Sequence, residues 1–237
     1  MSNTSTTLSR KRVSQVTIQR ATESPDAQLS ATARHMLDVA EPLFAEKGIE
    51  QVSLREIVAA SGQRNLSAAR YHFGSREQLI ALLLARRLWF INEDRHARLD
   101  ALEAAGRAGD VEALVRESLD ALASTVRDQP WGADYVRVAA QATFSPRLNP
   151  YDIVDPIYLS GHTRIARLLR AALPDLPERT FHDRMRLISN EIVFTLARWI
   201  SDHGPVTSPT RRRYDALVRH TIEFLVAGMK APSGEPT

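Results

Sequence analysis

Apolar residues recur three or four positions apart through most of this chain, and this spacing restricts its fold more than any other feature. The spacing is typical of α-helices that bury one face, because one helical turn takes 3.6 residues. Glycine and proline separate the periodic segments, and the alternating pattern of a β-strand is absent from the sequence. We therefore expect an all-α protein, with later helices at residues 76–104, 110–128, 132–143, 153–172, 178–203 and 208–230.

The segment before residue 76 predicts shorter helices. An apolar stripe runs from Ser30 to Gly48, and Gly48 suits the left-handed end of a helix. Ser53-Leu-Arg-Glu56 fits a capping box, in which the serine accepts a hydrogen bond from the third helical N–H and the glutamate reaches back. Ser75-Arg-Glu-Gln78 repeats this pattern at the start of the long helix. Two short helices between these caps, joined by a turn that contains glycine, predict a helix-turn-helix.

Composition excludes several classes of protein. The 237 residues include no cysteine, so disulfides, thiolate catalysis and cysteine-based zinc sites are excluded. No apolar run approaches the roughly 20 residues of a membrane span. The first 29 residues are polar and lack the apolar region of a secretory signal, so we expect a cytoplasmic protein. The formal net charge is only +3, so bulk charge does not argue for nucleic acid.

Catalytic motifs are missing from the sequence as well. The seven histidines show no His-Glu-x-x-His spacing, and there is no nucleophile elbow, P-loop or dinucleotide-binding glycine motif. We therefore expect no enzyme activity, no metal site and no cofactor.

The second short helix, at about residues 66–72, has an apolar back and a polar front. Ala69 and Phe73 can face the core. The polar residues of this helix and of the turn before it are then free to enter a major groove about 12 Å wide. They are Gln63, Arg64, Asn65, Ser67, Ala68 and Arg70. Arginine can pair with guanine, and asparagine or glutamine with adenine, through two hydrogen bonds, while alanine can contact a thymine methyl group.

Four stretches in this region resemble the DNA-binding domain of the tetracycline-repressor (TetR) family. They are Ala40-Glu-Pro-Leu-Phe-Ala-Glu-Lys-Gly48, Ser53-Leu-Arg-Glu-Ile57, Ala59-Ala-Ser-Gly62 and Tyr71-His-Phe-Gly-Ser-Arg-Glu-Gln-Leu79. The resemblance implies that Tyr71 and His72 bind DNA phosphates, as do Arg76 and the helix start at Ser53. Helix N-termini suit phosphate, because their free N–H groups and the helix dipole both favour an anion. The turn at residues 63–66 is one residue longer than the commonest family pattern, so the residues among 63–68 that read bases stay open.

Two C-terminal segments, 178–203 and 208–230, carry long apolar stripes. The resemblance implies that these helices pair with their copies in a four-helix interface of a homodimer, and burial within one chain is the alternative. The expected interface residues are Met185, Ile188, Ile192, Leu196, Trp199, Leu217, Ile222 and Leu225. Two recognition helices about 34–36 Å apart would then read a palindromic operator.

By the same resemblance, the middle helices enclose a pocket for a small-molecule effector. The aromatic and polar residues that could line it are Trp89, Phe90, Asn92, His96, Trp131, Tyr135, Phe144 and His162. Simple packing is the alternative for each of them. Most small-molecule sites are apolar cavities with a few polar anchors, so we expect a bulky, mainly apolar effector.

These features predict a DNA-binding transcriptional regulator, a repressor that a small ligand releases from its operator. The regulator could activate transcription instead of repressing it. The alternative function is a helical ligand-binding or interaction module without DNA binding. The expected parts are a flexible basic arm at 1–29, a helix-turn-helix domain at 30–78, an effector-binding and dimerisation domain at 79–230 and a disordered tail at 231–237. The arm either contacts DNA through its arginines and lysine or is a solvated tail.

Overall fold

The backbone of residues 20–233, the part that this computed structural model describes, consists of helices and turns and contains no strand. The all-α prediction is therefore confirmed. In chain order the elements are η1 (Pro25–Gln28), α1 (Ala31–Lys47), α2 (Leu54–Ala60), α3 (Leu66–Phe73), α4 (Arg76–Ala104), α5 (Val111–Asp128), α6 (Gly132–Phe144), α7 (Pro150–Ile153), η2 (Pro156–Leu159), α8 (Ser160–Ala172), α9 (Glu178–His203) and α10 (Arg211–Lys230). No helix of this range is long and apolar enough to cross a membrane.

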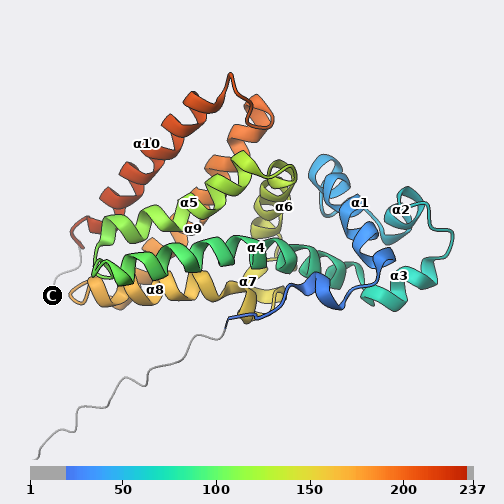
Figure 1. The fold of residues 1–237 in the computed structure, drawn as a ribbon, viewed down its shortest axis with the longest axis horizontal. Coiled ribbons are helices and arrows are strands. Elements are labelled where there is room, and N and C mark those ends of the chain that lie inside the picture. Colours follow the sequence, from blue (N-terminus) through green and yellow to red (C-terminus); the bar gives the residue numbers. More distant parts are fainter. Residues whose placement is uncertain (1–19, 234–237) are drawn as a thin grey trace, which may run out of the picture.

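The helices α1, α2 and α3 form a small unit at one end of the long helix α4 (Figure 1). Its centre is made of apolar side chains from all three helices, including the fully buried Met36, Phe44, Ile57 and Ala69. Because α2 and α3 have only seven and eight residues, neither would be stable alone, and this shared core holds them in place.

Both predicted serine caps are present, but only one is a complete capping box. The Ser75 hydroxyl accepts a hydrogen bond from the Gln78 N–H, and the Ser75 N–H donates to Gln78 Oε1, each at 3.1 Å. The Ser53 hydroxyl accepts from the Glu56 N–H at 3.2 Å. The Glu56 carboxylate, however, pairs with Lys47 of α1 instead of reaching back. The expected second half of this box is therefore wrong, because the ammonium group is a stronger partner for a carboxylate.

Helix α4 continues from the small unit into a larger helical body, where α5, α6 and α8 pack against it (Figure 1). Helix α9 packs on α6, and α10 lies on the outside against α5 and α9. The predicted helices agree with the structure to within a few residues, with one exception. The helix expected at 153–172 is divided into α7, η2 and α8. Pro156 explains the interruption, since a residue before proline avoids the helical conformation and Asp155 caps η2 through the Ile157 N–H at 3.0 Å.

Residues 20–29 lie against α4. Arg20 pairs with Asp100 at 2.9 Å, and Asp26 of η1 pairs with Arg86 at the same distance. A flexible arm was expected through residue 29, and this expectation is wrong for residues 20–29. The rest of the expected arm, with its cluster at Arg10, and the tail at 234–237 lie outside the described residues.

Candidate nucleic-acid interface and ligand cavity

Helix α3 presents one face to the core and the other to solvent, as its sequence predicts. Ala69 and Phe73 are buried behind it. On the front, Arg64, Ser67 and Arg70 are exposed and Gln63 is half-buried. Tyr71 at the helix end is 86% exposed, which is unusual for a ring of that size. The arrangement gives a protruding helix with cationic and hydroxyl groups on its outer face.

Asn65, one of the predicted base-reading residues, has its side chain engaged at the start of α3. The Asn65 side-chain oxygen accepts a hydrogen bond from the Ser67 N–H at 2.8 Å and so caps α3. Pairing with adenine uses both the oxygen and the nitrogen of an asparagine amide, so Asn65 would have to give up this cap to read a base. The side chain of Ala68 lies outside what the structure describes.

The Arg76 side chain binds to groups of the protein itself. Its guanidinium donates to the Ile49 carbonyl oxygen and lies 3.4 Å from Glu50 Oε2, so it fastens the start of α4 to the turn between α1 and α2. The phosphate contact expected for Arg76 is therefore not supported by its geometry. His72 is half-buried, with its ring edge-on to those of Tyr71 and Phe73.

The turn that holds Arg76 also contacts helix α6 of the larger body. The Gln141 side-chain oxygen accepts from the Ile49 N–H at 2.7 Å, and the Ser145 hydroxyl donates to Glu50 Oε1 at 2.7 Å. The Ser145 hydrogen bond, together with Arg76, lowers the pKa of the Glu50 carboxyl. Sequence reasoning missed this joint, because the two sides are more than 90 residues apart and neither carries a recognisable motif.

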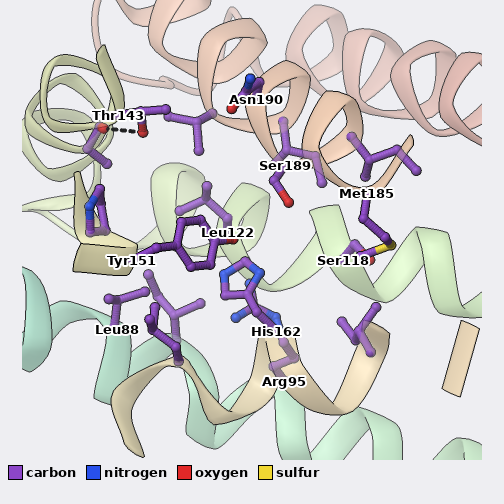
Figure 2. Close-up of a pocket in the computed structure, with 18 of the residues that line it drawn as sticks. Leu88, Arg95, Ser118, Leu122, Thr143, Tyr151, His162, Met185, Ser189 and Asn190 are labelled. Carbon is purple, nitrogen blue, oxygen red and sulfur yellow. Dashed lines mark hydrogen bonds between the residues drawn. The ribbon is translucent and has the colours of Figure 1, made fainter. Parts of the chain in front are cut away.

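The larger body encloses a cavity of about 80 Å³, the inner chamber, lined from α4, α5, α6, α7, α8 and α9 (Figure 2). A more open groove of about 620 Å³ adjoins it. Thr143, Tyr151, His162, Met185, Ser189 and Asn190 border both spaces. Together they have the size of small-molecule sites, which occupy roughly 300–1,000 Å³.

Three of the eight predicted pocket residues line these spaces. Tyr135 borders the inner chamber, Phe144 the groove, and His162 both. Trp89, Asn92 and His96 surround a gap of only about 10 Å³ beside Arg20. Phe90 and Trp131 pack edge-to-face with centroids 5.3 Å apart, and the Arg87 guanidinium stacks on Trp131. For these five residues packing is the better reading, because none of them borders the inner chamber or the groove.

The His96 ring is buried and contacts polar side chains of α8. Its Nε2 lies 3.0 Å from the Ser160 hydroxyl, and the Arg164 guanidinium lies 3.4 Å from its Nδ1. Burial, followed by the charges of Arg20 and Arg164, lowers the pKa of His96 to about 4. The ring is therefore neutral in the folded protein at pH 5, whereas it is charged in the unfolded chain.

This difference predicts a pH-dependent stability. Because the folded pKa lies below the unfolded value of about 6.5, the contribution of His96 is complete above pH 6.5 and is lost as the pH falls toward 4. Between pH 7.5 and 5, we expect His96 to account for a fall of about 2 kcal/mol in the free energy of unfolding. Urea denaturation of wild type and His96→Gln at both pH values measures it. Exposed His220→Gln is the control, and a pH slope that is the same in His96→Gln as in wild type would contradict the assignment.

Six of the eight residues expected at a dimer interface are buried inside the chain. Ile188, Ile192, Leu196, Trp199, Ile222 and Leu225 are each at most 5% exposed. Trp199, for example, stacks on His203 and packs edge-on to Tyr214. We expected this stripe to face a second chain. That is wrong for Ile192, Leu196, Trp199 and Ile222, because α5 and α6 cover those faces of α9 and α10. Ile188 and Leu225, although buried, also border the cleft between α9 and α10. Met185 and Leu217 are half-buried.

Beside these buried residues, α9 and α10 carry exposed apolar side chains that the prediction did not include. Leu187 of α9 is 65% exposed and Phe224 of α10 is 69% exposed. Both border a surface cleft of about 270 Å³ between the two helices, together with Arg184, Ile188, Glu191, Leu225 and Gly228. An aromatic side chain exposed beside an apolar cleft is a feature of protein–protein contact surfaces.

Family models match both parts of the chain. A model described as bacterial regulatory proteins of the tetR family matches residues 36–83, and one for the tetracyclin repressor-like C-terminal domain matches residues 112–228. The HTH-type transcriptional regulator AcrR of Shigella flexneri is 32% identical over 99 residues. This stretch is 41% of this chain and 43% of AcrR, so the match spans less than half of that relative.

Solved structures of regulators share the fold. FadR from Bacillus subtilis, in complex with stearoyl-CoA, has a TM-score of 0.58 and 14% identity over 82% of this chain and 98% of its own. NalD, the secondary repressor of the MexAB-OprM multidrug efflux pump in Pseudomonas aeruginosa, has a TM-score of 0.55 and 19% identity, covering 83% of this chain and 94% of NalD. At these identities the likeness concerns the fold.

A helix-turn-helix unit joined by one long helix to a cavity-containing helical body defines a class of regulatory proteins. With both of its parts matched, the chain belongs to the TetR family of bacterial regulatory proteins.

Proposed function

We propose that this protein is a DNA-binding transcriptional repressor that acts as a homodimer in the cytoplasm and is released from a palindromic operator by a small molecule. The observation that carries the proposal is the outer face of α3, where Arg64, Ser67, Arg70 and Tyr71 stand exposed on a helix that is held rigidly from behind. Family membership and the regulatory role of AcrR support it.

On DNA, α3 would lie in the major groove. Arg64 and Arg70 are its cationic side chains and are long enough to reach base edges or phosphates. Tyr71, at the end of the helix, would donate its hydroxyl to a phosphate. The N-terminus of α2, capped by Ser53, offers free N–H groups to a second phosphate.

Dimerisation would use the exposed faces of α9 and α10. In a two-fold arrangement the Leu187–Phe224 surface of one copy packs on the same surface of the other and forms a four-helix bundle. Two recognition units at a fixed separation would then read two half-sites of a palindrome.

Helix α6 supplies a route from the cavity to the DNA-binding unit. Tyr135 and Thr143 of α6 line the inner chamber, while Gln141 of the same helix holds the turn after α1. A ligand that is bound better by a shifted position of α6 would move this turn, and with it α2 and α3. It can weaken DNA binding only by as much as its affinity differs between the two positions.

A gel shift with DNA from upstream of the protein's own gene tests DNA binding. We expect wild-type dimer to retard this DNA at micromolar concentration in low salt. Tyr71→Ala should weaken binding to every bound sequence by about tenfold, the loss of one hydrogen bond to a charged group. The slope of affinity against salt should stay unchanged, because tyrosine carries no charge.

Tyr71→Phe is the matched control. It keeps the ring and removes only the hydroxyl, so it should lose as much affinity as Tyr71→Ala if the hydroxyl makes the contact. Because Tyr71 is 86% exposed, both variants should melt at the wild-type temperature. If Tyr71→Ala binds DNA as tightly as wild type, the phosphate contact is wrong. If no upstream fragment is retarded by wild type, the protein is instead a helical ligand-binding module without DNA binding.

A further inference from the structure

Arg95 of α4 is a buried cation at the wall of the inner chamber. It is 1% exposed, and it is among the largest fully buried side chains of the described residues. Its Nη1 donates to Asn92 Oδ1 at 2.9 Å. Its Nε is buried and has no hydrogen-bond partner among residues 20–233, and no carboxylate of that range lies within 4 Å of its guanidinium. Burying a charge without a counter-charge is costly, so this group calls for an explanation.

The nearest acidic residues are engaged elsewhere. Asp94 pairs with Arg98 at 2.8 Å, and Glu117 lies 3.7 Å from the same arginine. Burial lowers the pKa of Arg95 to about 10 and raises that of Glu117. At pH 7 the guanidinium therefore stays charged, without a carboxylate of the described chain in contact with it.

His162 and Tyr135 are two titratable groups that line the chamber with Arg95, and both are neutral. His162 lies next to it (Figure 2), and burial together with the charge of Arg95 lowers the pKa of His162 to about 3. Burial raises the pKa of the Tyr135 hydroxyl, which also borders the chamber. Both side chains can donate a hydrogen bond to an anion. The Ser118 hydroxyl, on the same wall, donates to the Leu114 carbonyl.

The remaining lining is mostly apolar. Leu88, Ile91, Leu122 and Ile188 surround the inner chamber, and Met185 stands where it meets the groove. In the groove, the rings of Phe144 and Phe194 are stacked with centroids 4.3 Å apart. The inner chamber therefore has one arginine in a mostly apolar lining, while the groove adds Arg186 and several polar side chains to the aromatic stack. A buried cation beside apolar walls matches a molecule with a charged head and a hydrocarbon body.

We propose that the effector is an organic monocarboxylic acid with an apolar body, and that its carboxylate binds the Arg95 guanidinium at the inner chamber. The Tyr135 hydroxyl and the His162 ring donate to the carboxylate oxygens. The hydrocarbon part lies between Met185 and the Phe144–Phe194 stack and extends into the groove. This inference rests on the proposed function only in naming the ligand an effector, since binding itself is independent of DNA.

Calorimetry with matched probes tests the proposal. The probes are straight-chain alkanoates of six to fourteen carbons, the alkanols and alkylamines of equal length, and 2-naphthoate with 2-naphthol. For wild type at pH 7.5 we expect at least one carboxylate to bind ten times or more tightly than its alcohol, and the amines to bind more weakly still. Equal affinity of carboxylate and alcohol, or binding by none of the probes, would overturn the proposal.

Arg95→Met separates a binding role from a structural one. Methionine keeps much of the length and apolar volume and removes the charge, so the preference for carboxylate over alcohol should disappear. If the buried cation serves the ligand, the unliganded variant should melt near the wild-type temperature, because removal of an uncompensated buried charge offsets the loss of its hydrogen bond to Asn92. A preference retained in Arg95→Met, or a marked fall in its melting temperature without ligand, would show that Arg95 serves the fold. Arg167→Met, at an exposed position of α8, is the control.

A gel shift with the same carboxylate separates this inference from the proposed function. Release of bound DNA by the carboxylate and not by the alcohol supports both. Carboxylate binding in a protein that retards no DNA leaves the site in place and rejects the repressor.

Discussion

Replacing Phe224 by arginine is expected to convert the protein from a dimer to a monomer and to lower its affinity for the operator by about 100-fold or more. Phe224 is 69% exposed on α10 and borders the cleft between α9 and α10. In a two-fold dimer an arginine there would be desolvated and would meet its own copy, so both the burial cost and the repulsion oppose association. Sedimentation velocity and a gel shift on the same samples measure the two effects.

The substitution is informative because it leaves the core of the subunit alone. Leu187→Arg, at the facing position on α9, should have the same effect, while Ala101→Arg adds the same charge on an exposed turn of α4 and should remain dimeric. Trp199→Arg would not be a clean test, since Trp199 is 4% exposed and packs on Tyr214, and its replacement would unfold the subunit. A Phe224→Arg protein that sediments as a dimer would reject this interface.

The two C-terminal helices show what hydrophobic periodicity can and cannot predict. The stripe on α9 and α10 predicts both helices within three residues of their observed bounds. It also marks the face of each helix that is buried, yet it does not say what covers that face. Here α5 and α6 of the same chain cover most of it, and the surface that we propose for dimerisation centres on exposed residues such as Phe224, which the stripe does not include.

The sequence does not predict whether a given arginine is exposed or buried. Arg76 and Arg95 both stand on α4, and nothing in their local sequence distinguishes a surface cation from a buried one. The fold brings Ile49 and Glu50 to Arg76 and encloses Arg95 beside the chamber. Both assignments depend on contacts with residues distant in the chain. Caps, by contrast, form within four residues, which is why Ser53 and Ser75 could be predicted.

Gly161 packs so closely against Asn92 and Arg95 that adding one methyl group there should destabilise the protein. It stands in the first turn of α8, against α4. A Cβ atom there would lie 2.3 Å from Asn92 Oδ1 and 2.9 Å from Arg95 Cδ. Asn92 is held on both sides, since its amide donates to the Tyr158 carbonyl at 2.6 Å and its oxygen accepts from Arg95. Asn92 therefore cannot move away from a Cβ atom without losing one of these two hydrogen bonds.

Gly161→Ala should therefore cost about 3 kcal/mol of stability, the sum of overpacking and a lost buried hydrogen bond. For a chain of this length that corresponds to a melting temperature lower by roughly 6–12 °C. Gly109→Ala is the control, because a Cβ atom at Gly109 meets nothing within 4 Å, and it should be neutral or slightly stabilising. Calorimetric melting of the two variants beside wild type makes the comparison. If Gly161→Ala melts with wild type, the close packing of α8 against Asn92 and Arg95 is rejected. If it melts low, the same displacement of Arg95 should also weaken carboxylate binding, because the anchor and the packing at Gly161 share one side chain.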